Sequence, residues 1–145
     1  MDSLQDLSPE DRAARERLEG RSDAMLARTL DWARINTGSW NTAALKGFAP
    51  GLADAFSELD ADVRLDPPKP FETIDDKGHS HETETGPILR VESRPQAPVQ
   101  VIMSGHYDTV FPPGTFDEIT DLGEGRMNGP GLADMKGGLI VMLEA

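Results

Sequence analysis

Apolar residues recur at helical spacing through the N-terminal part of the chain. Residues 22–36 and 41–60 carry them at intervals of three and four, which predicts two helices with one buried face each. Pro50 lies inside the second helix and should kink it, because proline lacks an amide donor. Residues 8–20 are highly charged, and Ser8 followed by a proline is typical of a helix start. We expect this first helix to pack weakly.

Farther along, the pattern changes to short stretches that are typical of strands. Residues 61–66 alternate in polarity, and residues 87–93 and 98–105 are further strand candidates. The last of these is apolar on both faces, so we expect its core, residues 99–104, to be a central strand covered on both sides. A small hairpin is predicted over 117–129.

These elements, with a helix that begins near residue 134, predict an α/β fold. We expect a central, mostly parallel sheet flanked by helices. The polar segment 71–86 is punctuated by glycine and should form a mobile connection. The chain stops at Ala145 inside an apolar helical run that has no glycine cap. We therefore expect the truncated, N-terminal part of a larger domain.

Composition narrows the functional classes. The formal net charge is −12 and no basic stripe is present, so we expect binding neither to nucleic acid nor to an anionic membrane surface. There is no cysteine, so a transition-metal site must use histidine and carboxylates. The N-terminus lacks an apolar signal segment and no run is long enough to cross a membrane, so a cytoplasmic location is the default.

The stretch SGHYDTVFP places a histidine and an acid two residues apart, directly after the apolar run. His106 and Asp108 would stand at the carboxyl end of a strand, where open α/β sheets bind ligands. Residues i and i+2 of an extended segment project to the same side, so the carboxylate can meet the imidazole. A metal-bound histidine usually donates its other N–H to a carboxylate or carbonyl. Taken alone, the pair also fits a strand end followed by a turn-forming aspartate.

A second motif, NGPGLADMKGG, places Asp134 among glycines at the start of a helix. The glycines allow tight packing around Asp134, and its two carboxylate oxygens can bridge two cations. One alternative is a phosphate-binding loop, since glycine-rich turns that enter a helix bind anions. A glycine follows Lys136 where that loop needs Ser or Thr, and the acid would repel phosphate. A purely structural turn is the other alternative.

Together the two motifs resemble the co-catalytic zinc metallopeptidases, the family of glutamate carboxypeptidase, acetylornithine deacetylase, succinyl-diaminopimelate desuccinylase and the aminoacylases. The Gly-Pro-Gly form is most similar to the glutamate carboxypeptidase branch, although Asn128 stands where that branch often has an aromatic residue. The resemblance implies that residues 22–145 are the N-terminal portion of a zinc-peptidase-like catalytic domain. Residues 1–21 would then be a charged N-terminal helix or extension.

The resemblance also implies roles for three residues. His106 would be a ligand of one metal, Asp134 the carboxylate that bridges both, and Asp108 the catalytic acid that orients His106. A cis peptide bond is implied at Asp134–Met135, and two Zn²⁺ ions per complete site, with Co²⁺ or Mn²⁺ able to replace them. The implied reaction is hydrolysis of an amide bond next to a free carboxylate by metal-activated water. Small peptides or N-acyl amino acids would be substrates, and the full-length form would be a homodimer.

Part of the family's site is missing from the 145 residues. The general-base glutamate, which the family carries in a Glu-Glu pair, does not occur, and neither do the later acidic and histidine ligands. We therefore expect this chain alone to be inactive. The alternative is a non-catalytic remnant or binding module that has lost the rest of the site.

Other polar and aromatic residues have plainer interpretations. His79 and His81 form an H-x-H pair, which can bind zinc, but in an acidic loop we expect them to be solvated. Lys136 is expected either to contact a substrate carboxylate or to face solvent. Trp32 and Trp40 are expected to pack near a helix end rather than to bind a ligand.

Overall fold

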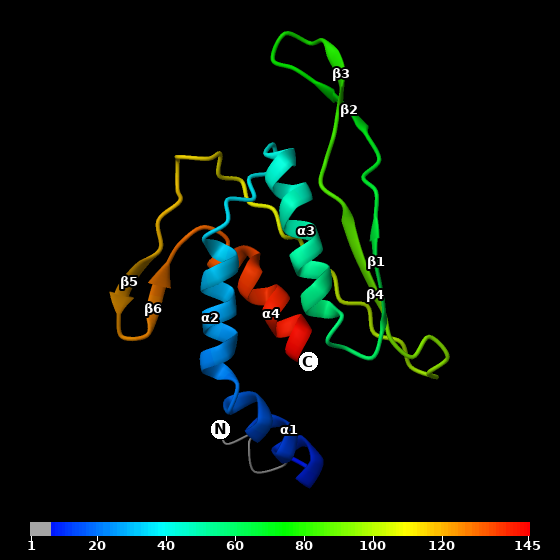
Figure 1. Ribbon diagram of the computed structural model, residues 1–145, viewed down its shortest axis with the longest axis vertical. Helices are drawn as coiled ribbons and strands as arrows, with labels where there is room; N and C mark the ends of the chain where they lie inside the picture. Colours follow the sequence, from blue (N-terminus) through cyan, green and yellow to red (C-terminus); the bar gives the residue numbers. More distant parts are fainter. Residues whose placement is uncertain (1–6) are drawn as a thin grey trace.

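The computed structural model describes residues 7–145 (Figure 1). Its N-terminal part contains the three predicted helices, α1 (Pro9–Glu19), α2 (Ser22–Ala33) and α3 (Thr42–Phe56). The α3 helix runs continuously through Pro50. Residues 1–6 of the predicted extension lie outside the described residues.

The start of α1 follows from its local sequence. The Ser8 hydroxyl accepts a hydrogen bond from the Asp11 amide, and the Asp11 carboxylate accepts one from the Ser8 amide. This reciprocal capping box satisfies two amides that the first turn leaves free. No residue of α1 is buried, so the predicted weak packing is confirmed.

Strands occur as three antiparallel pairs in the part of the chain that the structure describes. The pairs are β1 (Asp62–Asp66) with β4 (Ile88–Glu92), β2 (Phe71–Ile74) with β3 (Ser80–Thr83), and β5 (Thr120–Gly123) with β6 (Arg126–Asn128). The strands predicted at 61–66 and 87–93 and the hairpin at 117–129 are confirmed. Mixed helices and small antiparallel sheets are compatible with part of an α/β domain.

The expected central parallel sheet is not present among residues 7–145, and this prediction was wrong. Residues 99–104 form no strand and belong to no sheet. Their apolar side chains face solvent: Val101 is 80% exposed and Ile102 is 93% exposed. The apolar run marks a segment suited to a sheet interior, but a strand forms only when a second backbone satisfies its amides and carbonyls. No described strand lies against either edge of it.

The segment 71–86, which its polarity predicted to be a connection, contains the β2–β3 hairpin. Asp75 shapes the turn: its carboxylate accepts hydrogen bonds from the Lys77 and His79 amides at 2.9 and 2.8 Å. Gly78 has a φ of +83°, a conformation that glycine adopts without a steric penalty. A turn stabilised by an aspartate and a glycine therefore sets the pairing of two polar strands.

The core lies where α3 is covered on two sides (Figure 1). Phe48, Leu52 and Phe56 of α3 pack against Leu139 and Leu143 of α4 (Gly137–Glu144). The β1–β4 pair also contacts α3, and its residues Val63, Leu89 and Val91 pack against the same cluster. The predicted apolar stripe of α3 is thereby confirmed at its buried positions Leu45, Phe48, Leu52 and Phe56.

The α4 helix also packs against α2, and a short irregular helical turn, η1 (Leu132–Lys136), leads into it. This turn carries Asp134, so the core elements α2 and α4 flank one of the predicted site residues. Among residues 7–145, no helix is both long and apolar enough to cross a membrane.

Candidate functional site

The structure brings the two sequence motifs into direct contact. Nε2 of His106 lies 2.9 Å from Oδ1 of Asp134, although the residues are 28 positions apart. The His106 side chain is 46% exposed and that of Asp134 is 87% exposed, so both donor atoms can reach a ligand from solvent. The pair therefore offers a nitrogen and an oxygen at one accessible point.

Asp108 lies on the other side of the imidazole. Nδ1 of His106 is 3.0 Å from the Asp108 backbone carbonyl and 3.2 Å from its carboxylate Oδ1. Both are acceptors, and so is the Asp134 oxygen that Nε2 faces, so each ring nitrogen is directed at an acceptor. Partial burial lowers the pKa of His106, but the bond to the Asp108 carbonyl and the carboxylates of Asp134 and Asp108 outweigh this effect and raise it. In the absence of a cation, the ring is thus more readily protonated than a free imidazole.

The turn that presents Asp134 has an unusual backbone. The Asp134–Met135 peptide bond is cis, which confirms the bond geometry that the resemblance implied. Both residues also have non-helical backbone angles inside η1. Lys136 donates its amide to the Gly131 carbonyl at 2.7 Å, which closes the turn.

Glycines let this turn approach the His106 segment, as the sequence predicted. Gly131 has a φ of +69°, and a Cβ there would lie 3.1 Å from a methyl of Thr109. A Cβ on Gly105 would lie 2.7 Å from Cε of Met135. A side chain at Gly131 would be strained and would crowd Thr109, whereas one at Gly105 would displace the end of the Met135 side chain.

Lys136 is fully buried, so both expectations for it were wrong. Its ammonium donates to the backbone carbonyls of Trp32 and Ile35, at 2.9 and 2.7 Å, and lies 5.2 Å from the centre of the Phe48 ring. Burial lowers the pKa of Lys136 to about 8. The side chain thus ties the Asp134 turn to the end of α2, and it can contact no substrate.

Sequence reasoning also missed Thr37 and Ser39. Both lie in the loop after α2 and hydrogen-bond to the segment that carries His106 and Asp108. The only signal in the sequence was the stretch NTGS, in which small polar residues and a glycine follow a predicted helix. Such a stretch predicts a loop but not the residues that the loop contacts.

The remaining predicted residues lie apart from this pair. His79 and His81 are exposed on the β2–β3 hairpin, as expected, and His79 faces only Asp75. Trp32 packs edge-on against Phe48, which confirms its expected structural role. Trp40 is 72% exposed, so its expected packing was wrong.

The donor set fits part of a metal site. Zinc bonds of about 2.0–2.2 Å place two tetrahedral ligands roughly 3.4 Å apart. The separation of 2.9 Å between His106 and Asp134 needs only a small opening to reach that value. Residues 7–145 contain no group of three or more His, Cys, Asp or Glu side chains that could hold a metal ion. His106 and Asp134 would thus be two ligands of such a site, whereas catalytic zinc normally has three protein ligands.

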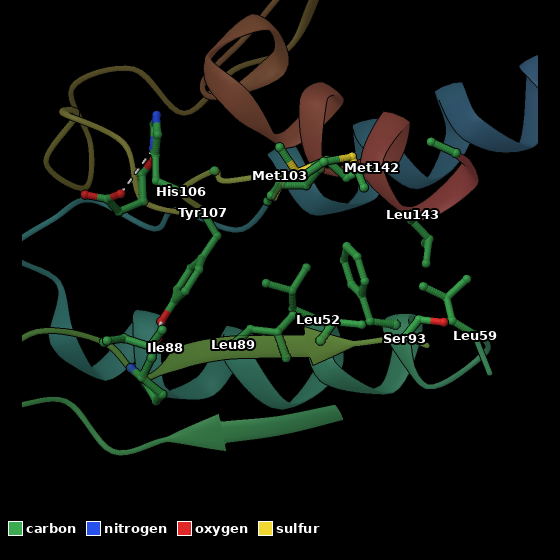
Figure 2. A pocket seen from close by; sticks show the side chains of 18 of the residues that line it. Leu52, Leu59, Ile88, Leu89, Ser93, Met103, His106, Tyr107, Met142 and Leu143 are labelled. Atoms are coloured by element: carbon green, nitrogen blue, oxygen red, sulfur yellow. Dashed lines mark hydrogen bonds and ion pairs between the residues drawn. The ribbon is translucent and has the colours of Figure 1, made fainter. Parts of the chain in front are cut away.

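A mostly apolar cavity of about 1270 Å³ adjoins the pair and is also lined by His106 and Asp108. Figure 2 shows α3 and β4 on one side of it and α4 on the other, with Leu52, Leu89, Met103 and Leu143 pointing inward. His106 and Tyr107 project to opposite sides of their segment, and Tyr107 reaches toward β4 (Figure 2). The Tyr107 hydroxyl donates to the Pro87 carbonyl at 2.7 Å.

Comparison with known proteins agrees with this pair of motifs. Residues 102–145 match the family model described as Peptidase family M20/M25/M40. The matched segment covers less than half of the chain but includes His106, Asp108 and Asp134. It supports the M20 peptidase family, and with it a peptidase or hydrolase type of function, without distinguishing a glutamate carboxypeptidase-like branch. No curated protein and no solved structure matches the chain.

Proposed function

We propose that the chain carries part of the active site of a metal-dependent hydrolase that cleaves an amide bond next to a free carboxylate. The observation that carries this proposal is the contact of 2.9 Å between His106 Nε2 and Asp134 Oδ1, with Asp108 held against Nδ1. His106 and Asp134 would hold the metal, with zinc as the first candidate and Co²⁺ or Mn²⁺ as substitutes. The substrate class, small peptides or N-acyl amino acids, rests on the family resemblance.

The chain's own residues supply the orientation that such a site needs. With a metal on Nε2, Nδ1 of His106 would donate a hydrogen bond to the Asp108 backbone carbonyl, and this would fix the tautomer and the orientation of the ring. Asp134 keeps most of its carboxylate in solvent and can therefore accept a second cation on its other oxygen. When bound, a pair of metal ions lowers the pKa of a water from 15.7 toward about 7 and polarises the scissile carbonyl.

Two ligands do not complete a catalytic site. No third ligand stands near the pair within the described residues, and no glutamate of a Glu-Glu pair is present as a general base. Loss of general-base assistance alone typically costs about 10²–10⁴-fold in rate. We therefore expect the 145-residue chain to bind zinc loosely and to hydrolyse nothing, and a complete enzyme to need further residues. That the full-length form is a homodimer is proposed from the family resemblance alone.

The absence of a third ligand among the described residues also favours a second candidate function. In this alternative the chain is a non-catalytic module that retains His106 and Asp134 but does not hydrolyse amides. The two candidate functions predict different coding sequence after residue 145. A frame that encodes a Glu-Glu pair and a late histidine after residue 145 favours the enzyme, and a stop codon at that point favours the module.

Zinc binding tests the proposed site directly. The chain has three histidines, so their ring signals can be followed separately by NMR during a Zn²⁺ titration. We expect the His106 signals to shift, while those of His79 and His81 on the hairpin stay in place. Unchanged His106 signals at saturating Zn²⁺ would contradict the metal site.

Activity is tested on the product of the whole reading frame, with N-acyl amino acids and glutamyl-terminated amides as substrates. Turnover that requires added metal and is lost in His106→Ala is the expected result. The 145-residue chain is assayed in parallel and should be inactive. If it shows turnover that disappears in His106→Ala, the two-ligand interpretation is wrong.

A further inference from the structure

The loop of residues 36–39 is hydrogen-bonded to the segment that carries His106 and Asp108. Thr109 donates its amide to the Thr37 carbonyl at 2.9 Å, and Ser39 donates its amide to the Thr109 carbonyl at 2.8 Å. The Thr37 hydroxyl adds a third bond, to the Tyr107 carbonyl, at 2.7 Å. These bonds form a short parallel bridge between two backbones that are about 70 residues apart in the chain. The backbone on either side of Asp108 is therefore fixed by this loop.

The Ser39 side chain extends this attachment to the acid itself. Its hydroxyl oxygen lies 2.6 Å from Oδ2 of Asp108 and 3.0 Å from the Thr109 carbonyl. A serine hydroxyl has one hydrogen to donate, and an ionised carboxylate at the shorter distance is the stronger acceptor. The other carboxylate oxygen of Asp108, Oδ1, faces Nδ1 of His106. The carboxylate is thus held between a hydroxyl on one side and the imidazole on the other.

We propose that Ser39 is a positioning residue for the candidate metal site, whose hydroxyl fixes the Asp108 carboxylate and through it the ring of His106. The Asp108 side chain is 39% exposed, so solvent leaves room for it to move to another of the three staggered positions about its χ1 torsion. Without the hydroxyl, the carboxylate turns toward water and its contact with Nδ1 weakens. Ser39 itself is held at its amide by Thr109, so its hydroxyl is ordered before any ligand binds.

This inference rests on the proposed function, in which His106 holds a metal. Groups that orient a metal-bound histidine typically contribute about 10–100-fold to metal affinity or activity. Ser39 acts one step farther away, through Asp108, so its removal should weaken Zn²⁺ binding by about tenfold, at the lower end of that range.

Two measurements on the 145-residue chain test the inference. The first determines the side-chain rotamer of Asp108 from three-bond couplings between its backbone and its carboxyl carbon, without metal. The wild type should show one rotamer, Ser39→Ala should show averaging, and Ser39→Thr, which keeps the hydroxyl, should return to one rotamer. The second is the Zn²⁺ titration of the His106 ring, in which Ser39→Ala should bind about tenfold more weakly and Ser39→Thr should match the wild type.

Ser57→Ala is the matched control, because the Ser57 hydroxyl donates only to the Ala53 carbonyl at the end of α3. Neither the Asp108 couplings nor the His106 titration should change in it. A single Asp108 rotamer in Ser39→Ala would overturn the positioning role. So would a zinc affinity of Ser39→Ala equal to that of the wild type, provided that the wild type binds zinc. If the wild-type His106 signals do not respond to Zn²⁺, the proposed function fails, and the couplings still decide whether Ser39 holds Asp108.

Discussion

The ammonium of Lys136 lies 2.7 Å from the backbone carbonyl of Ile35, two residues after the end of α2. This bond connects the turn that presents Asp134 with the helix that leads into the Ser39 loop. One end of α2 therefore contacts both halves of the candidate site: the loop that follows it holds Asp108, and its last carbonyls hold Lys136. The relative placement of His106 and Asp134 depends on these two attachments as well as on their own contact.

Replacing Lys136 should destabilise the fold even though the substitution removes a buried charge. In Lys136→Met the partly buried Ile35 carbonyl loses the hydrogen bond from the lysine ammonium, and a buried acceptor left unsatisfied costs about 1–3 kcal/mol. The free energy of unfolding at pH 7, from urea titration, should fall by that amount. Lys46→Met is the control: its ammonium pairs with Glu84 at the surface, and such pairs contribute about 0–1 kcal/mol. Equal losses in the two variants would show that the buried bonds of Lys136 add nothing.

The same lysine predicts how stability changes with pH. Burial lowers the pKa of Lys136 to about 8, from an ordinary value of 10.5. Between these values the unfolded chain binds more protons than the folded chain, so stability should rise with pH, by at most about 1.4 kcal/mol per unit. The pKa of Tyr107, raised by burial to about 12, acts in the opposite direction above pH 10. Urea unfolding of wild type and Lys136→Met from pH 7 to 10 isolates the effect, which only the wild type should show.

Gly38 should not tolerate a side chain. A Cβ at this position would lie 2.6 Å from the backbone carbonyl oxygen of Phe111, so the loop that carries Ser39 would have to move. We expect Gly38→Ala to lower the free energy of unfolding by about 1–3 kcal/mol, as overpacking does. Gly47→Ala is the matched control, since it is exposed in α3 with no atom within 4 Å of the added carbon. That variant should gain about 0.5–1 kcal/mol from reduced chain entropy, and a loss in both would contradict the clash.

Asp134 and Asp108 should differ in their effect on zinc. Asp134→Asn replaces the carboxylate that faces Nε2 of His106, so the zinc-dependent shift of the His106 signals should disappear. Asp108→Asn leaves both ligands in place and should retain binding, weakened by about 10–100-fold. Calorimetric titration of both variants measures the difference. An equal loss of zinc affinity in the two variants would contradict the assignment of Asp134 as a ligand and Asp108 as the residue that orients His106.

Patterns in the sequence were sufficient for the elements whose signals are local. The buried face of α3, the cap at Ser8 and the strands β1 and β4 follow from the spacing and type of neighbouring residues. The contact between His106 and Asp134 was also expected, because two specific motifs imply one site. A polar hairpin was missed at 71–83, since a turn built from Asp75 and Gly78 can pair strands that carry little apolar signal.

Tertiary structure alone decided the environment of Lys136, of Ser39 and of residues 99–104. A lysine at a helix start is ordinarily solvated, and it is buried here because backbone carbonyls more than 100 positions away accept hydrogen bonds from its ammonium. In the sequence Ser39 is only a loop residue, and its role depends on a contact with Asp108, which is 69 positions away. The apolar segment 99–104 has the composition of a central strand, yet it pairs with no described strand. Composition sets what a segment can bury, but hydrogen bonding and burial require partners that come from elsewhere in the chain.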